Sequence, residues 1–237
     1  MFVRYSLRTI DVDAARAFYR AVLGLDFSVP VEKSGIEAWP LHEQARARGA
    51  PPHWLGQIAT ADFEAKVARL LELGGERLGP TVKGRDGVFY ATVRDPVGAV
   101  VAVRESTPRP ERAAVAWHHL HTRELDRAWS AYSEVFGWKQ KEAVEIADVE
   151  GEVRMFAWDG DGANIGSVAN TARREGVHTH WLYYFPVVDL DASLELVRAA
   201  GGTALAPVDL PNRIRLAACE DPQGAAFGLL MSARHAP

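Results

Sequence analysis

The fold is decided by the stretch Asp11-Val-Asp-Ala-Ala-Arg-Ala-Phe-Tyr19, followed by Gly24-Leu25, because the chain carries it twice. The second copy reads Glu124-Leu-Asp-Arg-Ala-Trp-Ser-Ala-Tyr132 and is followed by Gly137-Trp138, so every matched position lies 113 residues later. Self-similarity at a fixed spacing is typical of duplicated structural units. The sequence therefore predicts a protein built from repeats.

A second repeat interleaves with the first. One copy comprises His53-Trp54-Leu55, Asp62, Gly74-Gly75 and Asp95-Pro96-Val97-Gly98; the other comprises His180-Trp181-Leu182, Asp189, Gly201-Gly202 and Asp221-Pro222-Gln223-Gly224. The offset is 127 residues up to the glycine pair and 126 at the Asp-Pro-x-Gly segment. The chain thus contains four modules, of which the first resembles the third and the second resembles the fourth. The third carries about fourteen residues that the first lacks.

The sequence of each module predicts the same order of secondary-structure elements. An apolar strand opens it, at residues 3–9, 54–59, 117–122 and 181–187. A helix with an acidic N-cap follows, at Asp11, Asp62, Glu124 and Asp189. In the second and fourth modules the helix ends at a Gly-Gly pair, and an Asp-Pro-x-Gly turn then joins two strands. The predicted unit is βαβββ.

These features resemble the vicinal oxygen chelate superfamily of glyoxalases, bleomycin-resistance proteins and extradiol dioxygenases. Within that superfamily, the four-module arrangement with Pro51-Pro52-His53-Trp54-Leu55-Gly56 resembles two-domain bacterial glyoxalase-like proteins that are often labelled hydroxylases. The resemblance implies an α+β fold in which four βαβββ modules pair into two open, barrel-like glyoxalase-type domains. The first domain spans 1–105, with modules at 1–50 and 53–105, and the second spans 116–232, with modules at 116–172 and 178–232. A polar, proline-containing linker at 106–115 joins them. A cross-pairing of modules stays open.

Composition limits the classes of function. The chain has 237 residues, 48% hydrophobic and 24% charged, and a net charge of −4 without a long run of one sign, which argues against a nucleic-acid partner. The sequence shows neither a signal peptide at its start nor an apolar stretch of membrane-spanning length, so we expect no membrane partner and a cytoplasmic location. The single cysteine, Cys219, is predicted to be a small core residue.

The resemblance also implies where a divalent metal would be held in the superfamily. Its ligands come from the first strand of a module, seven residues before the acidic cap, and from the last strand, about seven residues after the hairpin Asp. Those positions hold Arg4, Leu55, Trp117 and Leu182 on first strands, and Ala102 and Gly228 on last strands. None is an ordinary metal ligand. We therefore expect the usual metal site to be absent and no cofactor to be needed.

A displaced metal site is the alternative, since five of the eight histidines lie in two short stretches. If the first strands of the third and fourth modules run antiparallel with 117 opposite 182, then His119 falls opposite His180 and His121 opposite His178. Four imidazoles there would suit Zn²⁺, Ni²⁺ or Fe²⁺. The competing interpretation is that these histidines are polar residues at strand starts, bonded to the backbone or to water.

Other residues are candidates for binding an organic ligand. In the first half, Arg4, Ser6 and Arg8 share a strand face and, with His53, could hold a carboxylate or phosphate; the competing interpretation, which the sequence favours, is that both arginines lie on a solvated face. In the second half the candidates are the aromatic and imidazole side chains of the first strands, Trp117, His119, His121, His180 and Tyr184. Trp54 and Trp181 are predicted to be core residues.

The sequence thus predicts a glyoxalase/bleomycin-resistance-like protein that binds a small organic molecule, hydrophobic or aromatic, in a barrel cavity without the usual family metal. The alternative is a metal-dependent lyase, isomerase or dioxygenase that uses the displaced His cluster. No catalytic residue is assigned, and the protein is expected to be a monomer or homodimer. Because the first module is shorter, we expect the better-formed pocket in the second half.

Overall fold

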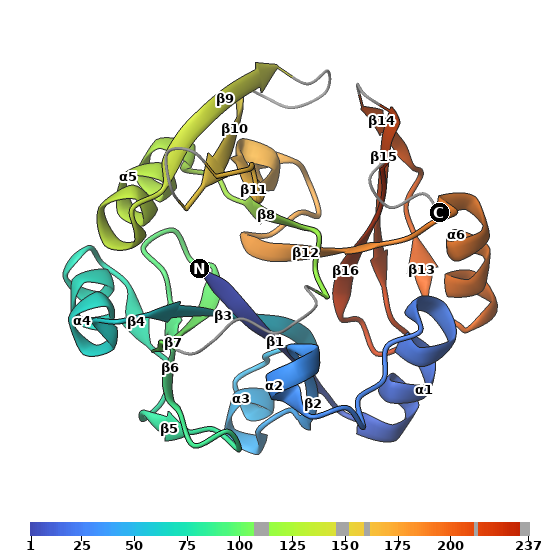
Figure 1. Cartoon of the computed structure of the whole chain (residues 1–237), viewed down its shortest axis with the longest axis horizontal. Coiled ribbons are helices and arrows are strands. Elements are labelled where there is room, and N and C mark those ends of the chain that lie inside the picture. The colour runs from blue at the N-terminus through green and yellow to red at the C-terminus, as the bar shows by residue number, and fades with distance from the viewer. Residues whose placement is uncertain (107–113, 146–151, 159–161, 211–212, 233–237) are drawn as a thin grey trace. The chain divides into compact units, whose positions relative to one another are not determined.

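A computed structural model describes residues 1–106, 114–145, 152–158, 162–210 and 213–232, with the side chains of 141–145 excepted (Figure 1). The linker predicted at 106–115 falls mostly on 107–113, outside the described residues, so the domain boundary stays a prediction. Among the helices of the described residues, none is long and apolar enough to cross a membrane.

The first two modules fill the N-terminal half. The first has strands β1 and β2 and three helices, namely β1 (Phe2–Thr9), α1 (Val12–Leu23), α2 (Val31–Ser34), β2 (Ile36–Pro40) and α3 (Glu43–Ala47). The second has one helix and five strands, namely β3 (His53–Thr60), α4 (Phe63–Glu72), β4 (Glu76–Arg77), β5 (Val82–Lys83), β6 (Phe89–Arg94) and β7 (Val100–Glu105). The first module is therefore shorter in strands than the predicted βαβββ unit.

The other two modules follow the same plan. The third keeps the full unit, with β8 (Trp117–His121), α5 (Leu125–Phe136), β9 (Lys139–Glu145), β10 (Glu152–Ala157) and β11 (Gly166–Ala169), followed by a short 3-10 helix η1 (Asn170–Arg173). The fourth has β12 (His180–Pro186), α6 (Leu190–Ala199), β13 (Thr203–Ala204), β14 (Val208–Leu210), β15 (Ile214–Glu220) and β16 (Ala226–Met231).

Two mixed sheets carry these strands, one from each pair of modules. The first and second modules form a seven-stranded sheet in the order β2-β1-β3-β7-β6-β4, with β5 on β6. The third and fourth form a nine-stranded sheet in the order β13-β15-β16-β12-β8-β11-β10-β9, with β14 on β15. The predicted α+β class is confirmed.

At the outer ends of the first strands, the pairing differs by one residue from the prediction. The Ala116 amide donates to the Tyr184 carbonyl at 2.8 Å, which sets 116 rather than 115 opposite 184. In the other sheet, the Met1 ammonium and the Ala59 amide exchange bonds at 3.0 and 2.9 Å, with the same displacement. Helix caps fix where a strand ends, but they do not fix how its neighbour pairs with it, so spacing from the caps could not give the register.

The helix N-caps and the Asp-Pro-x-Gly turns lie where the sequence predicts them. The Asp11 and Asp189 side chains accept bonds from backbone amides of the first turns of α1 and α6. Asp62 and Glu124 occupy the same N-cap position without such a bond. In the Asp-Pro-x-Gly turns, the Asp95 carboxylate accepts from the amides of Val97 and Ala99 at 3.0 and 2.8 Å. Gly98 and Gly224 have φ of 103° and 89°, a conformation that other residues resist.

The described chain forms two compact units. One comprises Met1–Val3, Gly56–Pro108 and Trp117–Leu182, and it brings α4 of the second module beside α5 of the third. Its core is aromatic, with Trp138 stacked on Phe156 at 3.8 Å between ring centroids. Trp181 is 4% exposed there, which confirms it as a core residue.

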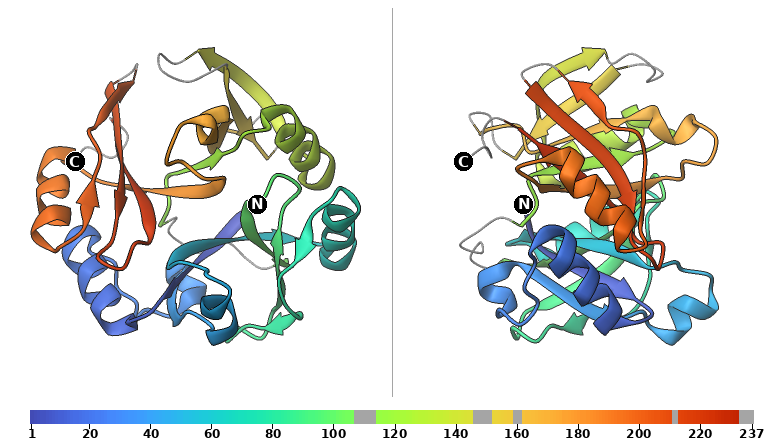
Figure 2. Two further views of the ribbon diagram at one scale, coloured as in Figure 1. Left: turned by 180° about the vertical axis from the view of Figure 1, so that it is seen from behind. Right: turned by 90° about the vertical axis from the view of Figure 1, so that its right-hand side faces the viewer.

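The other unit comprises Arg4–Leu55, Arg109–Ala116 and Tyr183–Pro237, and it brings α1 beside α6, as both views of Figure 2 show. Trp54 packs in its core against Tyr19 and Phe185, at 5.1 and 5.2 Å between ring centroids, and is 4% exposed. Cys219 is also buried, and burial raises the pKa of its thiol to about 12. Both residues have the core role that the sequence predicts.

Candidate ligand-binding site

Equivalent positions in the two sheets carry different chemistry. The first strand of the first module presents Arg4, Ser6 and Arg8, while the third module presents Trp117, His119 and His121 at the same positions. Similarly, His53, Leu55 and Gln57 of the second module correspond to His180, Leu182 and Tyr184 of the fourth. The repeats thus place cationic and amide groups in one sheet, and imidazoles and aromatic rings in the other.

His119 lies at the centre of a short hydrogen-bond chain. Strand β11 pairs in parallel with β8, so Ser167 lies directly opposite His119. The Ser167 hydroxyl lies 2.7 Å from Nδ1 of His119 and also accepts the indole N–H of Trp117 at 3.0 Å. Both Ser167 and His119 are buried. The chain fixes the orientation of the imidazole and of the neighbouring indole.

The other imidazoles of the predicted cluster gather around His119. The ring of His121 makes a T-shaped contact with that of His119, at 4.4 Å between centroids, and its Nδ1 lies 2.6 Å from the Thr171 hydroxyl. His180 stacks on His121 at 4.7 Å, and the exposed His178 stacks on His180 at 4.5 Å. All four candidates therefore come together, within one compact unit. Sequence reasoning missed Ser167 and Thr171, because the pairing of β11 with β8 leaves no signal in the spacing.

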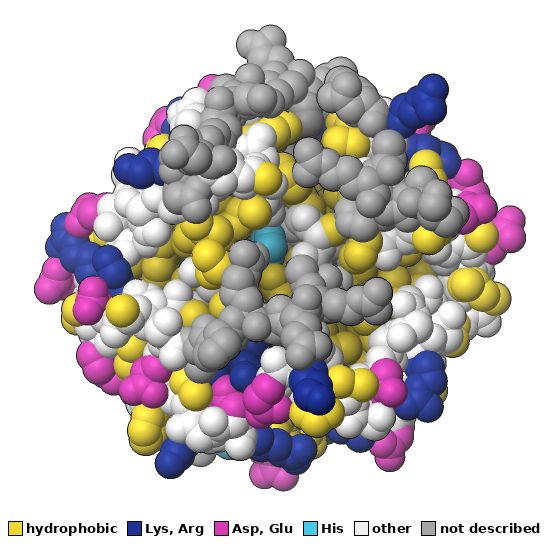
Figure 3. Space-filling view, in the orientation of Figure 1, with side chains coloured by type: hydrophobic (Ala, Val, Ile, Leu, Met, Phe, Trp, Pro, Cys, Tyr) yellow, Lys and Arg dark blue, Asp and Glu magenta, His cyan; other side chains and the backbone are white. Residues whose placement is uncertain are grey.

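Burial keeps these imidazoles neutral. It lowers the pKa of His119 to about 3, with a smaller contribution from a charge on His180. It also lowers the pKa of His180 to about 4 and that of His121 well below the ordinary value of 6.5. On the face shown in Figure 3, a histidine side chain is visible among hydrophobic ones. At neutral pH the cluster offers uncharged donors and acceptors rather than a positive charge.

The lowered pKa values predict acid sensitivity. A histidine whose pKa falls on folding stabilises the protein above its unfolded pKa, and that stability is lost as the pH falls toward the folded value. For His119, with a pKa of about 6.5 unfolded and about 3 folded, acidification from pH 6.5 to 5 removes about 2 kcal/mol. Urea unfolding at several pH values measures this loss. In His119→Asn, this loss should be smaller by about 2 kcal/mol, and an unchanged loss would contradict the prediction.

The first-half candidates lie in the other unit. Arg4 is 6% exposed, so the interpretation of its side chain on a solvated face is wrong. Ser6 is fully buried and donates its hydroxyl to Glu37, which is opposite it in the parallel pair of β1 and β2. His53 is half-buried, and Nδ1 of its ring donates to the Pro51 carbonyl at 2.8 Å. Burial lowers the pKa of His53, and the nearby Arg8 charge lowers it further.

A buried ion pair in the second module was not predicted. Arg104 on β7 is 2% exposed, donates to the Gln57 amide oxygen at 3.0 Å, and forms a close ion pair with Asp86. Its Nε has no partner among the described residues. Arg104 lies two positions beyond Ala102 on β7, and only the folded sheet brings Asp86 to it. The pair holds the loop between β5 and β6 against β7.

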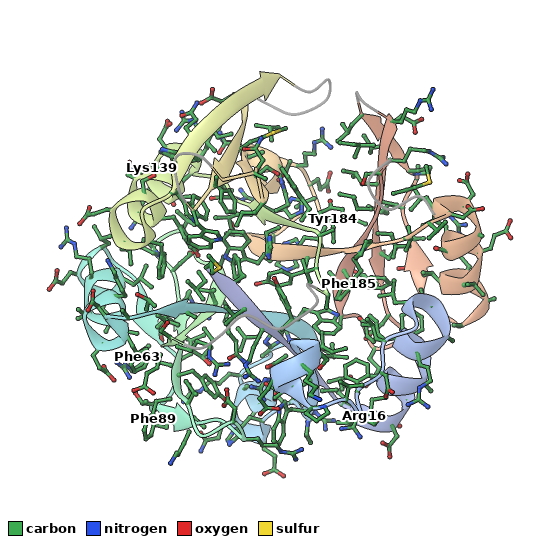
Figure 4. The ribbon with its side chains drawn as sticks, in the orientation of Figure 1. Arg16, Phe63, Phe89, Lys139, Tyr184 and Phe185 are labelled. Atoms are coloured by element: carbon green, nitrogen blue, oxygen red, sulfur yellow. The ribbon has the colours of Figure 1, made fainter. Side chains whose placement is uncertain are left out.

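Tyr184, a candidate of the fourth module, lies on β12 (Figure 4). It pairs with Gly228 of β16. A Cβ added to Gly228 would lie 2.2 Å from the Tyr184 ring, so the ring occupies the space that a side chain at 228 would need. Tyr184 is 6% exposed, and burial raises the pKa of its phenol well above the ordinary value. Tyr184 therefore has a packing role at this position.

Comparisons with known proteins agree with this arrangement. A model described as the Glyoxalase/Bleomycin resistance protein/Dioxygenase superfamily matches residues 114–229, and one described as a Glyoxalase-like domain matches residues 5–104. CFP32 of Mycobacterium tuberculosis (strain CDC 1551 / Oshkosh), whose name describes it as a glyoxylase, is 31% identical over 247 residues, covering 96% of this chain and 93% of CFP32. The chain belongs to the glyoxalase/bleomycin resistance protein/dioxygenase superfamily. The resemblance stated from the sequence is confirmed.

More distant similarities within the superfamily concern the fold and part of the chain. The anthracycline biosynthesis protein DauV of Streptomyces sp. (strain C5) is 34% identical over 114 residues, covering 43% of this chain and 41% of DauV. The Mn(II)-bound glyoxalase of Novosphingobium aromaticivorans has a TM-score of 0.65 at 12% identity, covering 99% of this chain and 83% of that one. The 2,3-dioxygenase LapB of Pseudomonas sp. KL28 has a TM-score of 0.62 at 13% identity, covering 98% and 91%.

The superfamily's metal does not fit the residues at its usual positions. Indole, guanidinium and aliphatic side chains are not metal ligands, and at 228 the Tyr184 ring takes the space of a side chain. The positions are occupied by Trp117, Leu182 and Gly228 in one sheet and by Arg4, Leu55 and Ala102 in the other. Among the described residues, no group of three or more His, Cys, Asp or Glu side chains could hold a metal ion.

The geometry of the displaced cluster explains why its members do not form such a group. A metal lies in the plane of each imidazole that binds it, about 2.0–2.1 Å from the nitrogen. His121 and His180 stack with 19° between their planes, and His178 and His180 with 29°. Nearly parallel, stacked planes meet far beyond coordination distance, so neither stacked pair can share one ion in this arrangement.

Proposed function

We propose that this superfamily member binds a small, planar, uncharged organic molecule against the imidazole cluster, defined as His119, His121 and His180 with Trp117, and that it does so without a resident metal. One observation carries the proposal: three imidazoles whose pKa values are lowered by burial lie together, beside an indole at the superfamily's metal position. Neutral imidazoles bond to uncharged polar groups, and aromatic rings favour a flat ligand.

The chemistry of the cluster sets limits on the ligand. A strongly anionic ligand gains little from imidazoles that stay neutral at pH 7, whereas hydroxyl, amide and carbonyl groups gain full hydrogen bonds. The name of the relative DauV refers to anthracycline biosynthesis, and anthracyclines have a flat polycyclic core. An anthracycline aglycone is therefore a suitable first probe. A catalytic role for the cluster is not assigned.

Titration with the aglycone tests this function. We expect saturable binding by fluorescence anisotropy, weakened about tenfold by Trp117→Leu, because aromatic contact contributes on the order of 1 kcal/mol beyond area and the leucine covers less of the ring system. Trp129→Leu, on helix α5, is the matched control and should bind as the unmodified protein does. Equal affinity in the two variants would show that Trp117 does not contact the ligand. Saturable binding absent in all three proteins would contradict the proposed function.

A further inference from the structure

The hydrogen bonds of Ser167 assign the proton of His119. The Trp117 indole can only donate, so the Ser167 oxygen accepts that bond at 3.0 Å. The buried Ser167 hydroxyl then needs an acceptor for its own proton, and Nδ1 of His119, at 2.7 Å, is its acceptor among the described residues. In the neutral ring, Nδ1 is therefore the bare nitrogen and Nε2 carries the hydrogen. Among the described residues, no hydrogen-bond partner is found for that Nε2.

His180 has the opposite assignment. Its Nδ1 lies 2.8 Å from the His178 carbonyl, which can only accept, so Nδ1 carries the hydrogen. Nε2 of neutral His180 is then a bare acceptor, again without a hydrogen-bond partner in the part of the chain that the structure describes. His53 is the residue of the second module that corresponds to His180, and its Nδ1 donates to the Pro51 carbonyl. The local backbone therefore fixes the same tautomer in both modules.

The two rings are close enough to contact one small molecule. Both contact His121, at 4.4 and 4.7 Å between ring centroids. We propose that His119 and His180 together recognise a neutral, planar ligand that carries a carbonyl next to an N–H or O–H group, such as a cyclic aromatic amide. Nε2–H of His119 donates to the carbonyl, and Nε2 of His180 accepts from the adjacent N–H. This inference rests on the proposed function and names its ligand class.

A series of quinolones tests the inference by calorimetric titration. The probe is 2-quinolone, which presents N–H beside C=O. 1-Methyl-2-quinolone loses only the donor and should bind about tenfold more weakly, as expected for one lost hydrogen bond to a site that cannot bond otherwise. 3-Methyl-2-quinolone gains the same methyl but keeps the donor, so it should bind as 2-quinolone does. This pair separates the hydrogen bond from the added volume.

Variants assign each bond to its ring. His180→Phe should abolish the difference in affinity between 2-quinolone and its 1-methyl derivative, because only His180 accepts a hydrogen bond from the N–H group of the ligand. His119→Phe should weaken both about equally and keep their ratio, since both ligands retain the carbonyl. His42→Phe, at an exposed position outside the imidazole cluster, is the control, with affinities unchanged. Nitrogen-15 NMR of the imidazoles, assigned through the same variants, should show the proton of His119 on Nε2 and that of His180 on Nδ1.

The outcomes separate the inference from the function on which it rests. Equal binding of 2-quinolone and 1-methyl-2-quinolone, or NMR spectra with both protons on the same nitrogen, overturns the inference. If the quinolones fail to bind while the anthracycline aglycone still binds through Trp117, the ligand class is wrong and the proposed function stands. If the aglycone also fails to bind, the proposed function fails with it.

Discussion

Tyr132→Phe lowers the free energy of unfolding by about 3 kcal/mol at pH 7.5. The Tyr132 hydroxyl donates to the buried carboxylate of Asp95 at 2.8 Å and accepts the indole N–H of Trp181 at 3.0 Å. Its removal takes away the donor to a buried charged group and the acceptor of a buried N–H at once. The bond also joins α5 of the third module to the Asp-Pro-x-Gly turn of the second. Urea unfolding measures the loss.

The repeat supplies the control for this prediction. Trp54 donates to the Tyr19 hydroxyl at 2.9 Å, as Trp181 does to Tyr132. The corresponding carboxylate is held less closely: burial raises the pKa of Asp221 and the Tyr19 hydroxyl opposes that rise, but no hydrogen bond of normal length reaches Oδ2 among the described residues. Tyr19→Phe should therefore cost less than Tyr132→Phe. Equal losses in the two variants would contradict the view that the shorter bond to Asp95 makes the larger contribution.

The loss should also depend on pH. Burial raises the pKa of Asp95 from 3.8 to about 6, while the bond from Tyr132 opposes that rise. A carboxyl with a raised folded pKa favours the folded state at low pH, and that contribution is lost as the pH rises through about 6. Ionised Asp95 then depends most on the Tyr132 hydroxyl. The difference between the variant and the unmodified protein should be largest above pH 6 and shrink toward pH 4.5.

Gly228→Ala has the second large effect, a loss of about 3 kcal/mol. Its Cβ would lie 2.2 Å from the ring of Tyr184, far inside contact distance, and both residues are on paired strands in the core of the sheet. The ring would have to leave its place above the Gly228 Cα atom. In the second module, Ala102 pairs with Gln57 in the same register and tolerates the methyl group, because a flexible amide replaces the ring.

A double-mutant cycle tests this explanation. In the background of Tyr184→Leu, Gly228→Ala should cost less than about 1 kcal/mol, so the coupling between the two sites is about 2 kcal/mol. Additive losses would show that the methyl group clashes with something other than the ring. The result bears on function, because position 228 is where the superfamily places a metal ligand on the last strand. A side chain that carried such a ligand would clash with the Tyr184 ring in the same way.

The repeats explain how much of the fold could be predicted from sequence. The copies around Tyr19 and Tyr132 and the two Asp-Pro-x-Gly turns place the helices and the hairpins, whereas the pairing of modules was left open by the sequence. At the outer ends of the first strands the pairing was predicted one residue off, because nothing local distinguishes adjacent registers, while the rings of His121 and His180 still lie in contact. The compact units also join α4 with α5 and α1 with α6, and they depend on side chains such as Asp95 and Tyr132 that lie in different modules.

The candidate site was predictable in its members and not in its chemistry. His119 and His121 fall in one short stretch of the sequence and His180 in another, and an assumed antiparallel pairing of the first strands predicted that the two stretches would meet. The planes and tautomers of the rings depend on Ser167 and on the His178 carbonyl, which reach them through strand pairing and a turn. Burial of Arg4 could not be foreseen either, since an arginine on an alternating strand is ordinarily solvated.

The most direct test of an organic site without a resident metal is one titration with two readouts. Untagged protein is dialysed against EDTA, its metal content is measured by elemental analysis, and the anthracycline aglycone is then titrated with EDTA still present, so that the ligand itself binds no metal. We predict substoichiometric metal and saturable binding that Trp117→Leu weakens. Near-stoichiometric metal that survives dialysis and disappears in His119→Ala or His180→Ala, with ligand binding lost when it is stripped, would contradict the central claim.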